Sequence, residues 1–201
     1  MENNQKRNIA IIVPTLRGGG AERAASNLSL YLSEKKYNKY IILYDAEKID
    51  YPHRGNLIDL NIKATNNLAG KIFNLIRRIY KLKRIKKKLH INVSISFLEA
   101  ANIVNIFSKT EDKIIVSIRN FKSKSSKSFY GKAYNYLIKI FYNRADILVA
   151  VSKGVKDDLI KNYGIEESKI KVIYNLYALE KIHKLAEEKI EDNYKDLFII
   201  L

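Results

Sequence analysis

The sequence predicts an α/β fold built on a doubly wound, mostly parallel sheet. Short runs rich in Ile and Val alternate along the chain with longer stretches whose apolar residues recur at helical spacing. Several of the short runs are apolar throughout, as expected of strands that helices cover on both faces. Strands that alternate with helices in this way are typical of parallel sheets.

The first half of the chain is expected to begin with a buried strand at residues 8–14 (NIAIIVP), which stops at Pro14. β-branched runs predict further strands at 40–44 and 91–97, with a weaker one at 56–60. Apolar residues at helical spacing predict helices at 21–36, 67–89 and 100–108.

The second half repeats this alternation. The expected strands are 113–118, 146–151 and 169–174, and the expected helices are 130–143 and 152–163. A basic loop at 120–128 (NFKSKSSKS) follows a strand, and parallel sheets bind ligands outside the carboxyl ends of their strands. A helix at 179–190 and a last strand at 195–201 complete the expected elements.

Composition excludes several kinds of site. Cysteine is absent, which excludes disulfides, thiolate metal sites and a cysteine nucleophile, and the three histidines lie too far apart for a zinc site. We expect no metal and no cofactor. The first apolar run, residues 9–13, is too short for a signal peptide, and no later run approaches the length of a spanning helix. We therefore expect a cytoplasmic protein.

Three consecutive glycines, Gly18, Gly19 and Gly20, connect the first strand to the first helix. Glycine allows close approach of the backbone to a ligand, and free N–H groups at a helix start attract anions, so the loop could cradle a phosphate or diphosphate. A plain strand-to-helix turn is the alternative. The dinucleotide fingerprint is excluded because Arg23 stands where a glycine is needed, and a P-loop motif is absent.

Three motifs, in the expected order and spacing, together resemble glycosyltransferase family 4. Residues 14–23 (PTLRGGGAER) resemble the glycine loop of that family. Residues 145–159, which contain AD, VAVS and GVKDDL, resemble its last N-domain strand and helix. Residues 163–175, which contain YGI and KIKVIYN, resemble the segment that leads to its interdomain hinge. The resemblance covers nearly the whole chain.

The resemblance implies one half of the GT-B architecture, in which two Rossmann-like domains face each other across a cleft. The chain would be the acceptor-side domain of a retaining hexosyltransferase, whose donor is a nucleotide sugar. The acceptor would be a cell-surface glycan or a polyprenyl-diphosphate-linked oligosaccharide. By the same resemblance, the loop Gly18 to Gly20 approaches the donor diphosphate, and its N–H groups stabilise charge on the leaving group.

Residues at two strand ends are candidates for the acceptor side. Arg119 and Asn120 lie where many relatives carry a histidine, and the planar guanidinium of Arg119 suits phosphate oxygens, a surface arginine being the alternative. Glu99 could bind a sugar hydroxyl and ranks below Arg119. Glu22 is interpreted as a helix-start carboxylate rather than a catalytic group. Because the histidine is missing, no catalytic residue is assigned.

The resemblance also implies a domain boundary. Residues 1–178 correspond to the N-terminal domain, and 179–201 to a hinge helix and the first strand of the donor-binding domain. That domain's basic residues and paired glutamates are not in this sequence. We expect the 201 residues to be inactive alone, because half of the transition-state contacts are missing. The chain would then be a truncated transferase, or a second chain would supply the donor half.

Over half of the net charge of +16 falls in one predicted helix. Residues 71–88 hold nine basic residues and no acidic one, with apolar positions at helical spacing. We expect the apolar stripe to pack on the sheet and the basic face to contact anionic lipid at the inner face of the cell membrane. The residues of this basic patch are Arg77, Arg78, Lys81, Arg84, Lys87 and Lys88.

Two other functions are compatible with the sequence. A basic nucleic-acid-binding module would use the charge and the fourteen tyrosines. Those tyrosines lie in predicted strands and helix cores, and no recognised nucleic-acid motif is present, so a nucleic-acid partner is not expected. A non-catalytic subunit that binds a separate donor-domain chain is the third possibility.

Overall fold

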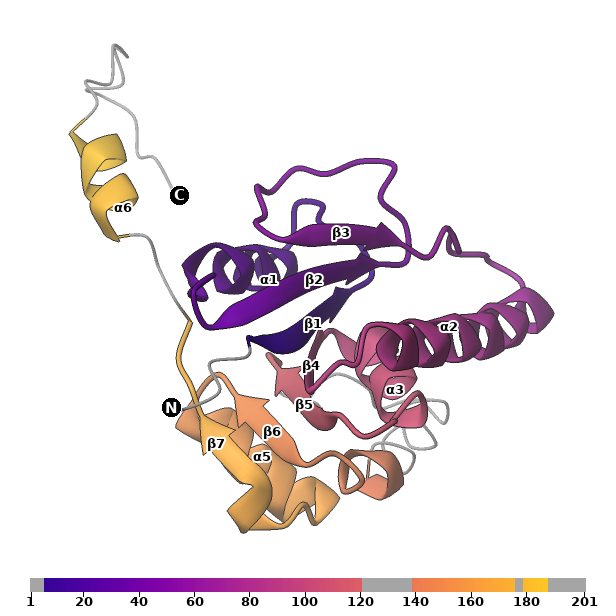
Figure 1. The fold of residues 1–201 in the computed structure, drawn as a ribbon. Coiled ribbons are helices and arrows are strands. Elements are labelled where there is room, and N and C mark those ends of the chain that lie inside the picture. Colours follow the sequence, from indigo (N-terminus) through magenta and orange to yellow (C-terminus); the bar gives the residue numbers. More distant parts are fainter. Residues whose placement is uncertain (1–5, 121–138, 176–178, 188–201) are drawn as a thin grey trace, which may run out of the picture.

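The structure, a computed structural model, describes residues 6–120, 139–175 and 179–187. Seven strands form one sheet in the order β3-β2-β1-β4-β5-β6-β7, and all neighbouring strands run parallel (Figure 1). The predicted doubly wound sheet is confirmed. Successive strands progress from β1 toward β3 on one side and from β4 toward β7 on the other, so a topological switch point lies between β1 and β4.

Most predicted elements are present with shifted ends. The strands are β1 (Arg7–Val13), β2 (Tyr37–Leu43), β3 (Asn56–Asp59), β4 (Val93–Phe97), β5 (Lys113–Ile118), β6 (Ile147–Ala150) and β7 (Ile170–Val172). The helices are α1 (Gly20–Tyr31), α2 (Leu68–Lys88), α3 (Glu99–Phe107), α5 (Lys153–Tyr163) and α6 (Leu179–Ala186), with a 3-10 turn at Glu167–Lys169. Residues 139–142 of the helix predicted at 130–143 are helical. The basic loop after Asn120 and the strand predicted at 195–201 lie outside the described residues.

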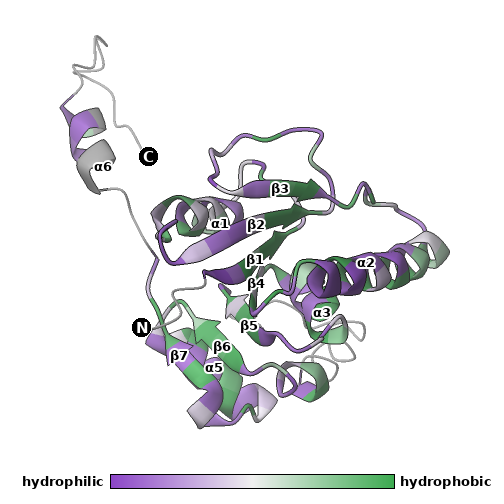
Figure 2. Ribbon diagram, viewed as in Figure 1, coloured by the Kyte–Doolittle hydropathy of each residue, from purple (hydrophilic) through white to green (hydrophobic). Residues whose placement is uncertain are grey.

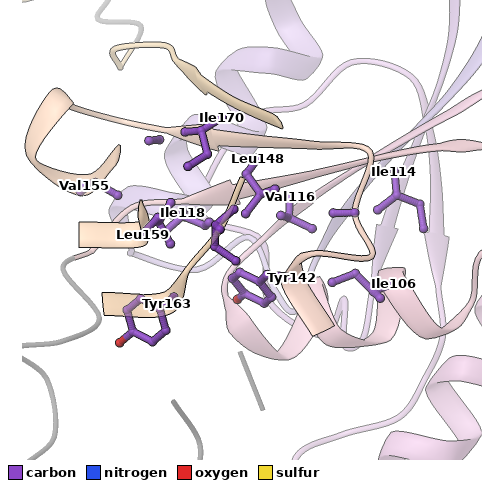
Figure 3. Close-up of a cluster of buried hydrophobic side chains, with 13 residues drawn as sticks. Ile106, Ile114, Val116, Ile118, Tyr142, Leu148, Val155, Leu159, Tyr163 and Ile170 are labelled. Carbon is purple, nitrogen blue, oxygen red and sulfur yellow. The ribbon is translucent and has the colours of Figure 1, made fainter. Parts of the chain in front are cut away.

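Helices cover the two faces of the sheet unequally. On one face, α2 and α3 pack over β1 and β2, and α5 packs over β5, β6 and β7 around Tyr142, Leu148 and Leu159 (Figure 3). The strand register carries this face continuously from Ala10 to Ile170. The opposite face is covered by α1, whose Ala21 and Ala25 pack on β1 and β2. In the described part of the chain, α1 is the helix that packs on that face.

A buried lysine holds the C-terminal end of α1. Lys39 of β2 is 3% exposed, and its ammonium donates to the carbonyl oxygens of Ser29 at 2.6 Å and Leu32 at 3.0 Å. In a longer helix these carbonyls would accept from N–H groups one turn later. The ammonium instead takes them, which explains why α1 ends at Tyr31 rather than at the predicted residue 36.

A buried hydrogen-bonded network, here called the polar seam, joins α2, α3, β4 and the start of β5. Its members are Lys86, Ser94, Ser96, Asn102, Asn105 and Asp112. The Lys86 ammonium lies 2.8 Å from a carboxylate oxygen of Asp112 and donates to the side-chain oxygen of Asn105 at 2.6 Å. Burial lowers the pKa of Lys86 to about 8. Burial alone would raise the pKa of Asp112, but the ammonium and its hydrogen bonds hold that pKa below its usual value.

The apolar stripe of α2 is divided between core and solvent. The stripe predicted from the sequence has seven apolar residues between Ile72 and Leu89. Five of them pack against the core, namely Leu75, Ile79, Leu82, Ile85 and Leu89. The other two, Ile72 and Ile76, are 53% and 59% exposed. The prediction that the stripe packs on the sheet is therefore correct for its inner residues and wrong for Ile72 and Ile76.

Candidate functional site

Contacts with the loop after β2 fix the course of the glycine loop. Gly18 adopts a φ of +35°, and its N–H donates to a carboxylate oxygen of Asp50 at 3.1 Å. The guanidinium of Arg17 lies 3.4 Å from the carboxylate of Asp45. The turn between β1 and α1 is therefore held by two contacts, that of Arg17 with Asp45 and that of Gly18 with Asp50. These contacts fix the position at which α1 begins.

Gly19 is the N-cap of α1 and lies beneath the carboxylate of Glu22. A Cβ at Gly19 would fall 2.2 Å from Glu22 Oε2, so the position requires glycine as long as Glu22 stays in place. The N–H of Gly19 donates to the carbonyl oxygen of Arg17. Glu22 faces the positive end of the helix dipole, which agrees with its interpretation as a helix-start carboxylate.

A hollow of about 420 Å³ opens beside the start of α1. Its walls are Gly20, Ala21, Glu22, Arg23, Ala24 and Asn27 of α1, Leu98 after β4, Arg119 and Asn120 after β5, and Asn175 after β7. The hollow thus lies at the carboxyl edge of the sheet, next to the switch point, where open parallel sheets bind ligands. The N–H groups of the first helical turn have no carbonyl one turn earlier, so they are available to an anion in the hollow.

The structure brings together Gly20, Arg119 and Asn120 among the residues predicted for the cleft. Gly18 and Gly19 belong to the same loop but lie outside the walls, and Glu99 begins α3 outside them as well. The guanidinium of Arg119 donates to the side-chain oxygen of Asn175, which ties the end of β5 to the segment after β7.

Sequence reasoning missed Arg23, Asn27 and Asn175. Arg23 and Asn27 follow Gly20 at spacings of three and seven residues, so helical periodicity alone places them on one face of α1 with Gly20. Asn175 comes shortly after β7, and parallel sheets bind ligands outside the carboxyl ends of their strands. The same rule that selected Arg119 after β5 therefore also selects Asn175. The guanidinium of Arg23 lies 5.5 Å from the centre of the Tyr51 ring, which helps to hold it at the rim.

Leu98 adopts a backbone conformation that residues other than glycine rarely use. It is the N-cap of α3, with a φ of 72° and a ψ of 149°. Strained residues of this kind cluster at functional sites, where the surrounding structure holds them in place. Leu98 lies in the wall of the hollow, so this rare backbone conformation falls at the same edge of the sheet as the other candidate residues.

An apolar groove of about 190 Å³ adjoins the hollow and shares Ala24, Arg119 and Asn175 with it. The groove lies on the α1 face of the sheet, and side chains of β4, β5 and the end of β6 line it. Ile173 and Tyr174, which follow β7, form another wall and are 56% and 63% exposed. The polar hollow therefore opens onto a surface of apolar character.

The structure splits the predicted basic patch in two. Arg77, Arg84, Lys87 and Lys88 are exposed. Arg78 and Lys81 differ from the prediction because they turn toward the body, where they donate to carbonyl oxygens that follow β3, at 2.7 Å and 2.8 Å. The guanidinium of Arg78 also lies over the Tyr44 ring at 4.3 Å, and burial lowers its pKa.

The described residues hold neither a candidate metal cluster nor a helix that could span a membrane. No three acidic or histidine side chains among them converge on a common point that could hold a metal ion. None of the helices in the described ranges has both the length and the apolar content needed to cross a bilayer.

Comparison with known proteins gives consistent results. The N-acetylgalactosamine-N,N'-diacetylbacillosaminyl-diphospho-undecaprenol 4-alpha-N-acetylgalactosaminyltransferase of Campylobacter jejuni is 27% identical over 198 residues, which are 96% of this chain and 53% of that protein. Sucrose-phosphate synthase from Thermosynechococcus elongatus is similar with a TM-score of 0.66 at 12% identity, covering 87% of this chain and 49% of that one. The Anabaena protein HepE, in complex with UDP and glucose, has a TM-score of 0.59 at 14% identity over 89% of this chain and 49% of its own.

The two structural likenesses establish the fold alone. The chain spans about half the length of the curated relatives it matches. The profile of Glycosyltransferase Family 4 matches residues 18–181, from the glycine loop to α6. Since this match covers most of the sequence, the chain belongs to Glycosyltransferase Family 4.

Proposed function

We propose that the chain is the acceptor-side half of a retaining glycosyltransferase, which moves a sugar from a nucleotide-sugar donor to a glycan or polyprenyl-diphosphate-linked acceptor. The observation that carries the proposal is the open hollow in which the start of α1 meets Arg119 and Asn120. The Campylobacter jejuni relative is named for a diphospho-undecaprenol substrate, which supports a lipid-linked acceptor.

The proposed role of the loop is electrostatic. Gly18 and Gly19 shape the turn, and their N–H groups already bond to Asp50 and Arg17. The N–H groups of Gly20 and Ala21 then stabilise the charge that builds up on the donor diphosphate as the sugar leaves. This arrangement accelerates the reaction only if the amides bind the leaving group more strongly in the transition state than in the donor.

Arg119 is proposed to bind a phosphate or sugar oxygen of the acceptor, with Asn120 beside it. Its contact with Asn175 orients the planar guanidinium, and an oriented fork of N–H donors suits phosphate oxygens. Glu99, which lies outside the wall of the hollow, would serve a sugar hydroxyl only if the acceptor extends past Leu98.

The donor site is assigned to a second domain, which in the proposal begins at residue 179 with the hinge helix α6. In the proposal, the hollow forms one wall of a cleft and the second domain forms the other. The groups that bind the nucleotide then belong to the second domain, so we expect no turnover from the 201 residues alone. Sugar transfer from a nucleotide donor by the purified chain would contradict this part of the proposal.

The proposal also places the chain at the inner face of the cell membrane through the exposed residues Arg77, Arg84, Lys87 and Lys88. Each basic residue near an anionic surface contributes about 1 kcal/mol of attraction, and salt screens that attraction. We expect binding to anionic vesicles that weakens as salt increases. Stronger binding to single-stranded RNA than to such vesicles at equal salt would favour the nucleic-acid alternative.

The decisive measurement is binding of a short-chain prenyl-diphosphate-linked N-acetylhexosamine to the purified chain by calorimetry. Loss of an oriented, charge-assisted pair in Arg119→Gln should weaken binding about tenfold or more. Arg144→Gln is the matched control, because that guanidinium stacks on Phe107 at 5.8 Å, away from the hollow. Equal affinities for the three proteins would remove the acceptor role of Arg119.

A further inference from the structure

On the α1 face of the sheet, apolar side chains of β5 and β6 are only partly covered by the described residues. Successive strand residues point to opposite faces, so every second residue of these strands belongs to the α1 face. Ile115 and Val149 on this face are half-buried. Their neighbours Val116 and Leu148, on the opposite face, are fully buried. Since strands of parallel sheets are normally covered on both faces, the α1 face here is open to an apolar partner.

These half-buried residues belong to the apolar groove, whose other walls are apolar as well. Leu28 of α1 contributes one wall, and the exposed side chains of Ile173 and Tyr174, which follow β7, contribute another. Figure 2 shows that β6, which supplies Val149, is hydrophobic (green) along its length. A groove with such walls favours a hydrocarbon over a strongly hydrated group, because burial of unpaired polar atoms is costly.

The groove ends at a cation where it meets the hollow. Arg119 and Asn175 belong to the walls of both spaces, and the guanidinium of Arg119 donates to the side-chain oxygen of Asn175. An occupant that extends through both spaces therefore needs an anionic group at Arg119 and a hydrocarbon beyond it. Together the two spaces have the volume of an ordinary small-molecule site, about 300–1,000 Å³.

We propose that the apolar groove binds the first isoprene units of a prenyl-diphosphate-linked acceptor, whose diphosphate lies at Arg119. The inference rests on the proposed function and adds to it a subsite for the carrier rather than for the sugar. The diphosphate meets the planar guanidinium, and the hydrocarbon that begins at the next bond enters the groove. At about 190 Å³ the groove accommodates a short stretch of one chain, so the two acyl chains of a phospholipid do not fit side by side.

Such a subsite makes the carrier lipid a determinant of affinity. Apolar burial contributes in proportion to the area that leaves water, so each isoprene unit that enters the groove strengthens binding. Units beyond the end of the groove contribute little. The proposal therefore predicts an affinity that increases with the first units of the chain and then levels off.

Calorimetry with soluble ligands tests this dependence. The ligands are an N-acetylhexosamine diphosphate without lipid and the same compound linked to a dimethylallyl, geranyl or farnesyl group. The geranyl ligand should bind about tenfold or more tightly than the lipid-free ligand, and the farnesyl ligand should add little. Equal affinities for the lipid-free and geranyl ligands overturn the proposal. So does an affinity that increases by the same factor through farnesyl, because a filled groove has no room for a further unit.

Substitution of the exposed wall assigns the effect to the groove. The double variant Ile173→Ser with Tyr174→Ser should bind the lipid-free and geranyl ligands with similar affinity. Tyr31→Ser is the matched control and should keep the preference for geranyl, because Tyr31 is 64% exposed on α1 and lies outside the groove. The measured quantity is a ratio of two affinities, so a partial loss of folding does not imitate the result. An unchanged ratio in the double variant overturns the proposal.

A tryptophan reporter distinguishes the prenyl chain from other occupants, since the chain has no tryptophan of its own. The emission of Tyr174→Trp should shift to the blue with the geranyl ligand, but not with the lipid-free ligand or soluble short-chain phosphatidylglycerol. Tyr31→Trp should show no shift. An equal shift with phosphatidylglycerol overturns the proposal. So does emission that is already blue-shifted without ligand and is reversed by dilution, which indicates a second copy, or by Ile182→Ser, which indicates α6.

These outcomes separate the inference from the proposed function. If the lipid-free ligand binds and Arg119→Gln weakens it, but the prenyl group adds nothing, the subsite is wrong and the acceptor role of Arg119 stands. If the geranyl ligand still shifts the Tyr174→Trp emission and Arg119→Gln leaves its affinity unchanged, the apolar subsite stands and the acceptor role of Arg119 is wrong. Absence of binding by all four ligands overturns both.

Discussion

The polar seam and the hollow hold polar groups in opposite ways. In the seam, the side chains of Lys86, Asn105 and Asp112 are buried and bond to one another. At the hollow, Gly20 and Asn120 are exposed, and the first turn of α1 offers its N–H groups to solvent. Buried polar groups that satisfy one another stabilise a fold, whereas polar groups around an open concavity at the carboxyl edge are available to a ligand.

The largest expected effect comes from breaking the seam. Lys86→Met leaves the Asp112 carboxylate buried without its cation, which should cost about 3–5 kcal/mol in the free energy of unfolding. Urea denaturation measures that loss. The double variant with Asp112→Leu should recover part of it, because no charge is then left unpaired. A loss below about 1 kcal/mol in the single variant would mean that water reaches the pair.

Acid should act on the same region. The folded-state pKa of Asp112 lies below its ordinary value, as does that of Asp146, which bonds to Lys109 at 2.9 Å. Each carboxylate therefore contributes stability that is complete above the unfolded pKa of about 4 and is lost as the pH falls through the folded value. Denaturation curves at a series of pH values should show this loss. An unchanged acid limb in Asp112→Asn would contradict the assignment to Asp112.

Gly19→Ala probes the boundary between structure and site. The new Cβ would collide with the end of the Glu22 side chain, which can swing away, so the expected loss of stability is about 1 kcal/mol. Displacement of that carboxylate into the hollow should nevertheless weaken binding of the prenyl-diphosphate ligand by repulsion. Adding Glu22→Ala should restore both properties, and a failure to do so would place the collision elsewhere.

The smallest expected change in stability belongs to Arg119→Gln. The side chain lies at the wall of the hollow rather than in a core cluster, so the free energy of unfolding should change by no more than about 0.5 kcal/mol. The same variant is expected to lose affinity for the acceptor analogue. Thermal unfolding together with calorimetry tests the pair of outcomes. A large loss of stability would place Arg119 with the seam rather than with a binding site.

Periodicity and strand-end rules predicted much of the architecture. The Ile- and Val-rich runs predicted the parallel strands, and the strand-end rule pointed to Arg119 and Asn120, which lie in the wall of the hollow. Those rules depend on local patterns and on the geometry that all parallel sheets share, so they work without knowledge of tertiary contacts.

The sequence did not predict side-chain orientations that depend on contacts with residues far away in the chain. Spacing cannot show that Arg78 and Lys81 turn inward, because their acceptors are carbonyl oxygens after β3, well before them in the chain. The exposure of Ile72 and Ile76 likewise depends on how far α2 extends past the sheet (Figure 1). Helical periodicity identifies an apolar side of a helix but cannot say how much of its length meets a core.

The burial of Lys39 couples two ends of α1. The helix has 12 residues and so spans about 18 Å, with the ammonium fixed at one end and the amides that are proposed to bind an anion at the other. A packed helix moves as a rigid rod, so a small tilt imposed at the lysine swings the amides at the far tip. If the proposed site binds its ligand as argued above, a substitution of Lys39 in β2 should change ligand affinity without altering any group in the wall of the hollow.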